Sequence, residues 1–339
     1  MEFTAGGRLE VRITPADVGK RVSVRRGTGG GEHGVGFTDT VGVLTSWTDG
    51  VLVITRRDGE SVRIAEKALV AGKVVPAAPA RRRGPAASYE EVARACARAW
   101  PPVESERLGE WELRGASGFT RRANSVLPLG DPGRPLDTAL AYVRSWYARR
   151  GLPAYVQAAT GAAGTQEALC AALDERGWRR EVTTRVHVGG LAPVGDLDAD
   201  TGRVALTRDV DEAWLRRYQR SARPGPHMLK VLTGGPSVWF AAVPGESGGD
   251  GVPAAIGRCV VDGRWAGFMA VEVDPARRRQ GLATAVMAAL ARRALDEGAS
   301  AAWLQVEEDN AGALALYDRM GFALHHRYHH YREPEGTAP

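Results

Sequence analysis

The sequence has few cysteines and no long apolar run, and each shortage excludes a class of protein. Its 339 residues contain three cysteines, Cys96, Cys170 and Cys259, which are widely separated. An odd number at such spacing excludes a disulfide framework and offers no metal-ligand pattern, so buried free thiols are expected. No run is apolar enough to span a membrane, and the first residues lack the layout of a signal peptide, so a cytoplasmic protein is expected.

Lysine is also scarce, because nearly all basic residues are arginines. The chain carries 45 Lys and Arg against 40 Asp and Glu, and its formal net charge is +5. A modest positive charge suits acidic ligands such as a nucleotide cofactor, without by itself indicating a nucleic-acid binder. The chain is too long for one ordinary core and suggests two or three domains.

The residues from 265 to 297 form the most informative pattern. A strand is predicted over 265–273, a basic turn follows, and an Ala/Leu-rich helix is predicted over 282–297. In the turn, Arg278-x-x-Gly281-x-Ala283 keeps bulky side chains away from the backbone amides. A helix N-terminus adds roughly half a positive charge at the same place. The pattern therefore predicts an anion site that takes a pyrophosphate.

A second pattern follows further along the chain, from Leu304 to Phe322, and it contains Asn310 and Tyr317. In this order and at this separation, the two patterns resemble the acetyl-CoA half of the GNAT N-acetyltransferases, specifically over residues 254–332. The resemblance implies an α/β fold with a mixed sheet flanked by helices. It also implies acetyl-CoA as co-substrate, no metal, and an amine acceptor, which is a protein lysine, an N-terminus or a small molecule.

The resemblance also assigns the cofactor contacts. Backbone groups of the strand before the turn would pair with the pantetheine arm, and the turn and helix start would hold the pyrophosphate. Asn310 of the second pattern would contact the cofactor arm or the acceptor site. The residues implied are Val271, Val273, Arg278, Arg279, Gln280, Gly281, Leu282, Ala283, Thr284, Asn310 and Ala313.

Acyl transfer to an amine needs an acid and a base. An amine with a pKa of about 10.4 must lose a proton before it attacks, and the departing thiolate must gain one. By resemblance, Tyr317 is the acid. Some family members use a glutamate as the base on the strand before the turn, but Gly267 occupies that position. Glu272 and Glu307 remain as candidates, and each is equally explained as a solvated carboxylate at a strand end.

The organisation expected along the chain has four parts. Residues 1–78 contain short strands, among them one over 9–13, with a glycine-rich loop over 27–36, and resemble the SH3-like barrel at the front of some actinobacterial GNAT proteins. Residues 79–87 are a linker with three arginines. Residues 88–190 resemble a degenerate GNAT half, with a capping Ser88 and a strand over 119–126. Residues 191–335 form the catalytic GNAT domain.

Several alternatives stay open. The tail 322–332 alternates like a strand, and its histidines bind a metal or line the acceptor cleft. Because no cysteine lies in the two patterns, the amine is expected to attack the thioester directly in a ternary complex. The rivals are a non-catalytic acetyl-CoA-responsive binding protein and a module whose barrel binds protein or nucleic acid. Nucleic acid is not favoured, because the barrel lacks an aromatic stacking platform.

Overall fold

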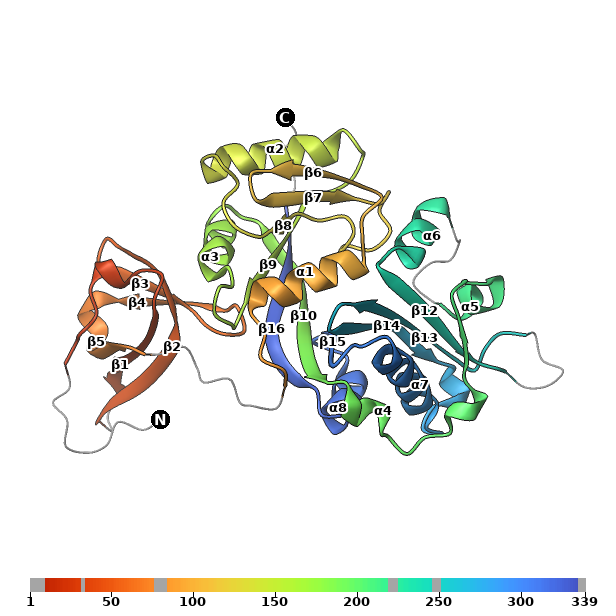
Figure 1. Ribbon diagram of the computed structural model, residues 1–339. Coiled ribbons are helices and arrows are strands. Elements are labelled where there is room, and N and C mark those ends of the chain that lie inside the picture. Colours follow the sequence, from red (N-terminus) through yellow and green to blue (C-terminus); the bar gives the residue numbers. More distant parts are fainter. Residues whose placement is uncertain (1–9, 32–33, 76–83, 219–224, 246–250, 335–339) are drawn as a thin grey trace. The chain divides into compact units, whose positions relative to one another are not determined.

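The computed structural model describes residues 10–31, 34–75, 84–218, 225–245 and 251–334 (Figure 1). The chain divides into two compact units. The first comprises Met1–Ala80 and Ala158–Arg179, and the second comprises Arg81–Gln157 and Arg180–Pro339. The domain boundaries expected from the sequence stay predictions. The arginines of the expected linker, at 81–83, lie outside the described residues.

The first unit contains an antiparallel sheet of five strands in the order β4-β3-β2-β1-β5. The strands are β1 Arg21–Gly31, β2 Gly34–Thr48, β3 Val51–Thr55, β4 Ser61–Ala65 and β5 Leu69–Val74, with short 3-10 turns at Pro15–Asp17 and Glu66–Ala68. A small aliphatic core includes Val24, Leu44 and Ile54. The helix α3, Glu167–Glu175, belongs to the same unit and contacts β2 and β3. The meander of strands is present, and the SH3-like barrel stays a prediction.

Two expectations for the first unit were wrong. The strand expected over 9–13 makes only an isolated bridge, between Val11 and Gly72, and β5 provides the fifth strand instead. The glycine-rich stretch 27–36 lies largely within β1 and β2, where Gly27 pairs with Phe37 and Thr28 with Gly36. Strand pairing uses backbone groups, so low side-chain content does not prevent it.

The second unit contains nearly all of a mixed sheet of eight strands in the order β11-β12-β13-β14-β15-β10-β16-β9. Its strands are β9 Tyr155–Thr160, β10 Arg179–Gly190, β11 Ala205–Thr207, β12 Ser237–Val243, β13 Ala255–Asp262, β14 Trp265–Val273, β15 Ala301–Glu307 and β16 Ala323–Arg332. From β11 to β10 along the sheet, β14 and β15 pair in parallel, and the other neighbouring strands pair antiparallel. The near-continuous burial of β13 fits a sheet covered on both faces.

Each half of the repeat contributes its last strand to the other half. β10 follows the first half in sequence but pairs with β15, over Thr184–Glu307 to Gly190–Ala301. β16 ends the second half and lies between β10 and β9. The two GNAT-like halves therefore form one continuous sheet by exchanging strands, which sequence periodicity alone does not reveal.

Helices cover both faces of this sheet (Figure 1). The helix α7, Leu282–Asp296, packs on β12, β13 and β14, and α1, Tyr89–Ala99, contacts β13 and β14. Ser88 caps α1 as predicted, because its side chain accepts a hydrogen bond from Glu91 N at 3.1 Å. The remaining helices of the unit are α2 Leu136–Ala148, α4 Ala192–Gly195, α5 Glu212–Arg217, α6 Pro226–Thr233 and α8 Ala311–Arg319, with 3-10 turns at Thr201–Arg203 and Pro275–Arg277.

The start of the second unit differs from the strand pattern expected there. A small sheet contains β6 Glu104–Leu108, β7 Trp111–Gly115 and β8 Leu127–Pro128 in that order. The strand expected over 119–126 was wrong, since most of this stretch forms turns. Thr120 has a φ of 58°, and the Asn124 side chain accepts hydrogen bonds from Ala116 N and Gly118 N. This local bonding replaces a strand ladder.

Candidate functional site

The neighbouring strands β14 and β15 pair over only part of their length in the middle of the large sheet. They pair in parallel from Trp265–Ala301 to Phe268–Leu304 and then separate. Beyond that point β14 continues along β13 as far as Val273, while β15 continues along β10 as far as Glu307. Past Phe268, the side of β14 that faced β15 is therefore no longer paired with that strand, which is the arrangement expected where an extended ligand arm adds to a sheet.

A β-bulge bends β14 just after the strands separate. The register along β13 shifts between Ile256 and Arg258, and Ala270 has a φ of 51°. A non-glycine residue in this conformation carries strain, and such strain concentrates at functional positions. The bulge sets the directions of the next side chains. Val271 packs against the core beneath α7, whereas Glu272 pairs with Ile256.

The turn between β14 and α7 is held by side chains at both of its ends. Asp274 accepts a hydrogen bond from Ala276 N at 2.9 Å, and Arg217 Nη2 donates to Asp274 Oδ2 at 2.6 Å. The hydrogen bond from Ala276 and then the Arg217 guanidinium keep the pKa of Asp274 below its usual range. Within the turn, Arg277 Nε donates to Gln280 Oε1 at 3.0 Å. These hydrogen bonds therefore hold the turn in one conformation.

The start of α7 has the properties of an anion site. Gly281 is its N-cap with a φ of 75°, and its residue type provides no side-chain cap. The amides of Leu282, Ala283 and Thr284 have no hydrogen-bond acceptor among the described residues, as expected for the first turn of an uncapped helix. Arg278, Arg279 and Gln280 are exposed beside these amides. The turn and helix start can thus receive a phosphate group.

The second sequence pattern forms α8 and its N-cap. Asn310 Oδ1 accepts a hydrogen bond from Ala313 N at 3.1 Å, so its carbonyl oxygen caps the helix. Ala313 lies partly buried against the core. Because the carbonyl oxygen of Asn310 caps the helix, its side-chain NH2 group is the part that would contact the cofactor. The cofactor roles of Asn310 and Ala313 stay predictions.

Tyr317 lies on α8 and is 8% exposed. Its ring packs edge-on against Phe322 with centroids 6.1 Å apart, and Phe322 in turn packs against Phe268, the last residue of β14 that pairs with β15. The phenol therefore belongs to the core next to the point where the strands separate. Burial raises the pKa of Tyr317 to about 12. A phenol with this pKa is protonated at neutral pH and has a proton to donate.

The position of the family glutamate cannot hold a side chain here. A Cβ atom at Gly267 would lie 2.2 Å from Trp303 Cζ2, because the indole of Trp303 covers this residue from β15. The two candidates for the base lie further along their strands. Glu272 is partly buried on β14, and Glu307 is exposed at the end of β15. The structure does not distinguish between them, so both stay predictions.

The neighbouring Glu308 is already committed to other partners. It pairs with Arg185 at 2.7 Å and with Arg327 at 3.1 Å. Partial burial opposes ionisation, but the hydrogen bonds from Arg327 and Arg185 prevail and lower the pKa of Glu308. Such a carboxylate is a weak proton acceptor.

The histidines of β16 do not form a metal centre in the described part of the chain. No group of three or more His, Cys, Asp and Glu side chains in these residues could hold a metal ion. His325 Nδ1 lies 2.8 Å from His326 Nδ1, and burial, followed by the neighbouring His325, lowers the pKa of His326 well below its usual range. His326 therefore stays neutral near pH 7.

Sequence reasoning missed two arginines that support the turn. Arg203 Nη2 donates to Gln280 O at 3.4 Å, and Arg217 reaches both Asp274 and Pro253 O. Both come from segments far from the turn in sequence, so no local pattern could have indicated them.

No helix in the described residues is both long and apolar enough to cross a membrane.

The open strands, the bulge and the uncapped helix after a basic turn define the GNAT class of N-acetyltransferases, here in tandem. Two solved structures share the fold. A GCN5-related N-acetyltransferase from Kribbella flavida is 19% identical, with a TM-score of 0.52 over 74% of this chain and 98% of that chain. A tandem GNAT protein from the clavulanic acid biosynthesis pathway is 14% identical, with a TM-score of 0.51 over 76% and 91%.

The sequence comparisons narrow the class. Residues 87–331 match the family model described as Probable histone acetyltransferase Rv0428c C-terminal, and the chain belongs to this family. The full-length relative, Probable histone acetyltransferase Rv0428c of Mycobacterium tuberculosis, is 29% identical over 315 residues, which are 91% of this chain and 93% of the relative. The protein is therefore a GNAT-type acetyltransferase.

Proposed function

We propose that this acetyltransferase transfers the acetyl group of acetyl-CoA to a primary amine by direct attack in a ternary complex. The observation that carries the proposal is the gap between β14 and β15 with the uncapped N-terminus of α7 at its end. In this proposal the pantetheine arm pairs with the backbone of Val271 and Val273. The amides of residues 281–284 receive the pyrophosphate, with Arg278 and Arg279 beside it.

The proposed mechanism needs two proton transfers, one from the amine and one to the departing thiolate. Glu272 or Glu307 takes a proton from the amine, directly or through water, and backbone N–H groups of β14 stabilise the oxyanion. Tyr317 then donates its proton to the departing thiolate. No covalent enzyme intermediate is proposed. The three cysteines are buried, and burial raises the pKa of both Cys96 and Cys259 to about 12, so neither is an effective nucleophile.

The test combines binding with turnover. Isothermal titration with acetyl-CoA should show binding, and a thiol reagent should report release of CoA when amines are added from three groups: lysine peptides, peptides with free N-termini, and small amines. Because the protein's own thiols are buried, they should contribute little signal. Absence of acetyl-CoA binding would refute the proposal.

One observation favours a second candidate, a non-catalytic protein that binds acetyl-CoA and responds to it. The family position for a glutamate base is Gly267, covered by Trp303. Tight acetyl-CoA binding without turnover on any amine of the panel would support this candidate.

The acceptor class stays a proposal too. The Mycobacterium tuberculosis relative carries the name of a histone acetyltransferase, which makes protein lysines one acceptor class to test.

A further inference from the structure

Arg258, on β13, carries a buried charge without a carboxylate partner. Its side chain is 0% exposed, and it forms no ion pair with an acidic side chain in the described residues. Burial lowers the pKa of Arg258 to about 9, so the guanidinium still carries its charge at neutral pH. A buried charge is costly unless it is compensated, and an apolar side chain of similar volume often serves stability equally well. The arginine therefore needs an explanation beyond the filling of space.

The compensation comes from the C-terminal ends of two helices. Arg258 Nε donates to Leu232 O at 2.6 Å, and Nη2 donates to Gly234 O at 2.6 Å, both at the end of α6. Nη1 donates at 3.0 Å to the carbonyl oxygen of Ala99, the last residue of α1. The last carbonyl groups of a helix lack intrahelical partners, and each helix end carries roughly half a negative charge. Two helix ends together therefore balance one guanidinium, and Arg258 joins both of them to β13.

The same side chain reaches the strand that carries the bulge. Arg258 Nη1 donates to Met269 Sδ at 3.4 Å. The two residues also pair across β13 and β14, and the pair Ile256–Glu272 lies two residues away on β13 but three residues away on β14. The extra residue on β14 is the bulge. Arg258 thus holds β14 at the pair where the regular register ends.

The bulge is held from both faces of the sheet. Ala270 has a φ of 51°, a strained conformation that persists only where the surrounding structure fixes it. On one face, a Cβ atom at Gly257 would lie 2.4 Å from Val286 Cγ1, so β13 lies directly against α7. The next residue, Arg258, points to the opposite face, where it ties β13 to α1 and α6. Fixed elements therefore enclose the strained backbone.

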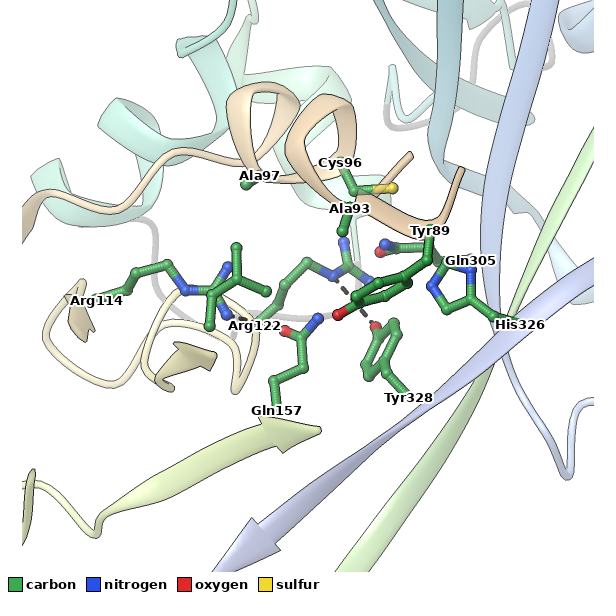
Figure 2. Close-up of a pocket in the computed structure, with 11 residues that line it drawn as sticks. Tyr89, Ala93, Cys96, Ala97, Arg114, Arg122, Gln157, Gln305, His326 and Tyr328 are labelled. Atoms are coloured by element: carbon green, nitrogen blue, oxygen red, sulfur yellow. Dashed lines mark hydrogen bonds between the residues drawn. The ribbon is translucent and has the colours of Figure 1, made fainter. Parts of the chain in front are cut away.

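Arg114 provides a comparison, because it is a second arginine buried without a carboxylate partner. It is 1% exposed and donates to Ser125 O at 2.9 Å, to Ser125 Oγ at 3.0 Å and to Gln157 Oε1 at 2.9 Å. Figure 2 shows it with Gln157 and Arg122 beside a small cavity, whose volume of about 10 Å³ suits one water molecule. Arg114 makes no hydrogen bond to β13 or β14 in the described part of the chain.

We propose that Arg258 is a positioning residue for acetyl transfer, which holds the bulge of β14 so that the N–H groups of this strand point at the thioester carbonyl. The inference rests on the proposed function, in which these groups stabilise the oxyanion. Such donors are effective only within hydrogen-bond distance of the place where the charge develops. In this proposal Arg258 acts through the strand, without touching the substrate.

The first experiment compares Arg258→Lys with the matched variant Arg114→Lys. Lysine keeps the buried charge, but its single nitrogen cannot replace a planar guanidinium that donates to two helix ends and to Met269 at once. Both variants should have a lower Tm, and they are assayed well below it with acetyl-CoA and the best amine of the panel. In Arg258→Lys, kcat should fall roughly tenfold to 100-fold, because misdirecting an oxyanion donor costs part of what removing it costs. In Arg114→Lys, kcat should not change.

The affinity for acetyl-CoA separates positioning from a general loss of structure. Isothermal titration should give nearly the same Kd in both variants as in the unaltered protein, because the start of α7, which would hold the pyrophosphate, is retained. A fall in kcat of equal size in both variants, or none in Arg258→Lys, would overturn the proposal.

A second measurement follows the bulge without substrate. Amide hydrogen exchange over residues 269–273 should be faster in Arg258→Lys than in the unaltered protein, and unchanged in Arg114→Lys. If exchange behaves in this way but the unaltered protein does not bind acetyl-CoA, the proposed function fails while Arg258 still holds the bulge. If the unaltered protein turns over acetyl-CoA but Arg258→Lys keeps both its kcat and its slow exchange, the proposed function stands and the positioning role fails.

Met269→Leu tests the same link and decides the matter if Arg258→Lys does not fold. Leucine nearly keeps the volume of methionine, so the fold is retained, but the sulfur that accepts from Arg258 is lost. The expected result is faster exchange over 269–273 and a kcat lower by roughly twofold to tenfold, the range for one hydrogen bond. Met287→Leu, at a buried position of α7, is the control and should change neither. Unaltered kcat and exchange in Met269→Leu, or equal changes in Met287→Leu, would contradict the proposal.

Discussion

At the scale of single residues, burial determines what Tyr317 can do. Its ring belongs to the core, and burial raises the pKa of the phenol from 10.0 to about 12. A general acid must still hold its proton at the pH where the amine has lost its own. With a pKa of about 12, the phenol meets this condition over the whole range in which an amine with a pKa of about 10.4 becomes reactive.

Replacing Tyr317 by Phe should lower kcat by about 100-fold or more, because the thiolate then leaves without a proton donor. The Kd for acetyl-CoA should change little, since the ring that packs on Phe322 is retained. The pH profile gives a second check. Activity of the unaltered enzyme should not fall between pH 7 and about pH 10, because deprotonation of the phenol begins only as the pH approaches its raised pKa. An unchanged kcat in Tyr317→Phe would exclude the role.

At Gly267, the neighbouring Trp303 leaves no room for a catalytic side chain. The Trp303 indole covers it so closely that a Cβ atom would lie 2.2 Å from Trp303 Cζ2. Gly267→Ala should therefore lower the free energy of unfolding by about 1–3 kcal/mol, as overpacking does. Denaturant unfolding measures this. The control is Gly312→Ala on α8, whose nearest atom is Asn310 Oδ1 at 3.9 Å, and which should leave the stability unchanged or slightly higher. Equal stabilities in the two variants would contradict this account of the site.

At the scale of elements, the start of α7 depends on one backbone conformation. Gly281 has a φ of 75°, and nothing lies within 4 Å of a Cβ built there. Gly281→Ala should thus cost backbone strain of about 1–2 kcal/mol and no steric clash. The Kd for acetyl-CoA should rise roughly tenfold, while the Kd for acetyl-pantetheine, which lacks the pyrophosphate, should not change.

Gly263→Ala is the matched control for this change. Gly263 lies in the turn between β13 and β14, has a φ of 58° and is equally open, so the strain is similar but far from the start of α7. It should lower stability to a comparable degree and leave the affinity for acetyl-CoA unaltered. If both variants weaken acetyl-CoA binding equally, the effect comes from general destabilisation and the pyrophosphate site is wrong.

The elements around the site could largely be predicted from the sequence, but their irregularities could not. The strand 265–273 and the helix beginning at Leu282 were confirmed, because their apolar patterns and the glycine at the turn are local signals. The bulge at Ala270 has no such signal, since alanine does not favour a φ of 51°. Arg217 and the cover that Trp303 provides over Gly267 depend on contacts between distant segments, which no single pattern contains.

At the scale of the whole molecule, the repeat was visible in the sequence, but the exchange of strands was not. Periodicity gave two similar halves, whereas strand pairing places β10 beside β15 and β16 between β10 and β9. A sheet interrupted at β15 would expose the edge of a strand whose residues are mostly buried. We therefore expect each half of the second unit to depend on the other for its fold.

This dependence predicts the behaviour of a cut chain. A protease site inserted after the exposed Asp198 would separate a piece that carries β10 from a piece, 199–339, that carries β14, β15 and the candidate acetyl-CoA site. After cleavage the two pieces should stay associated on gel filtration and keep acetyl-CoA affinity, because the ladder from Thr184–Glu307 to Gly190–Ala301 is intact. The piece 199–339 produced alone should lack cooperative unfolding and acetyl-CoA binding. Adding the complementary piece during refolding should restore both. If 199–339 folds alone and binds acetyl-CoA, then β10 is dispensable to the sheet, and the exchange of strands does not contribute to the stability of the site.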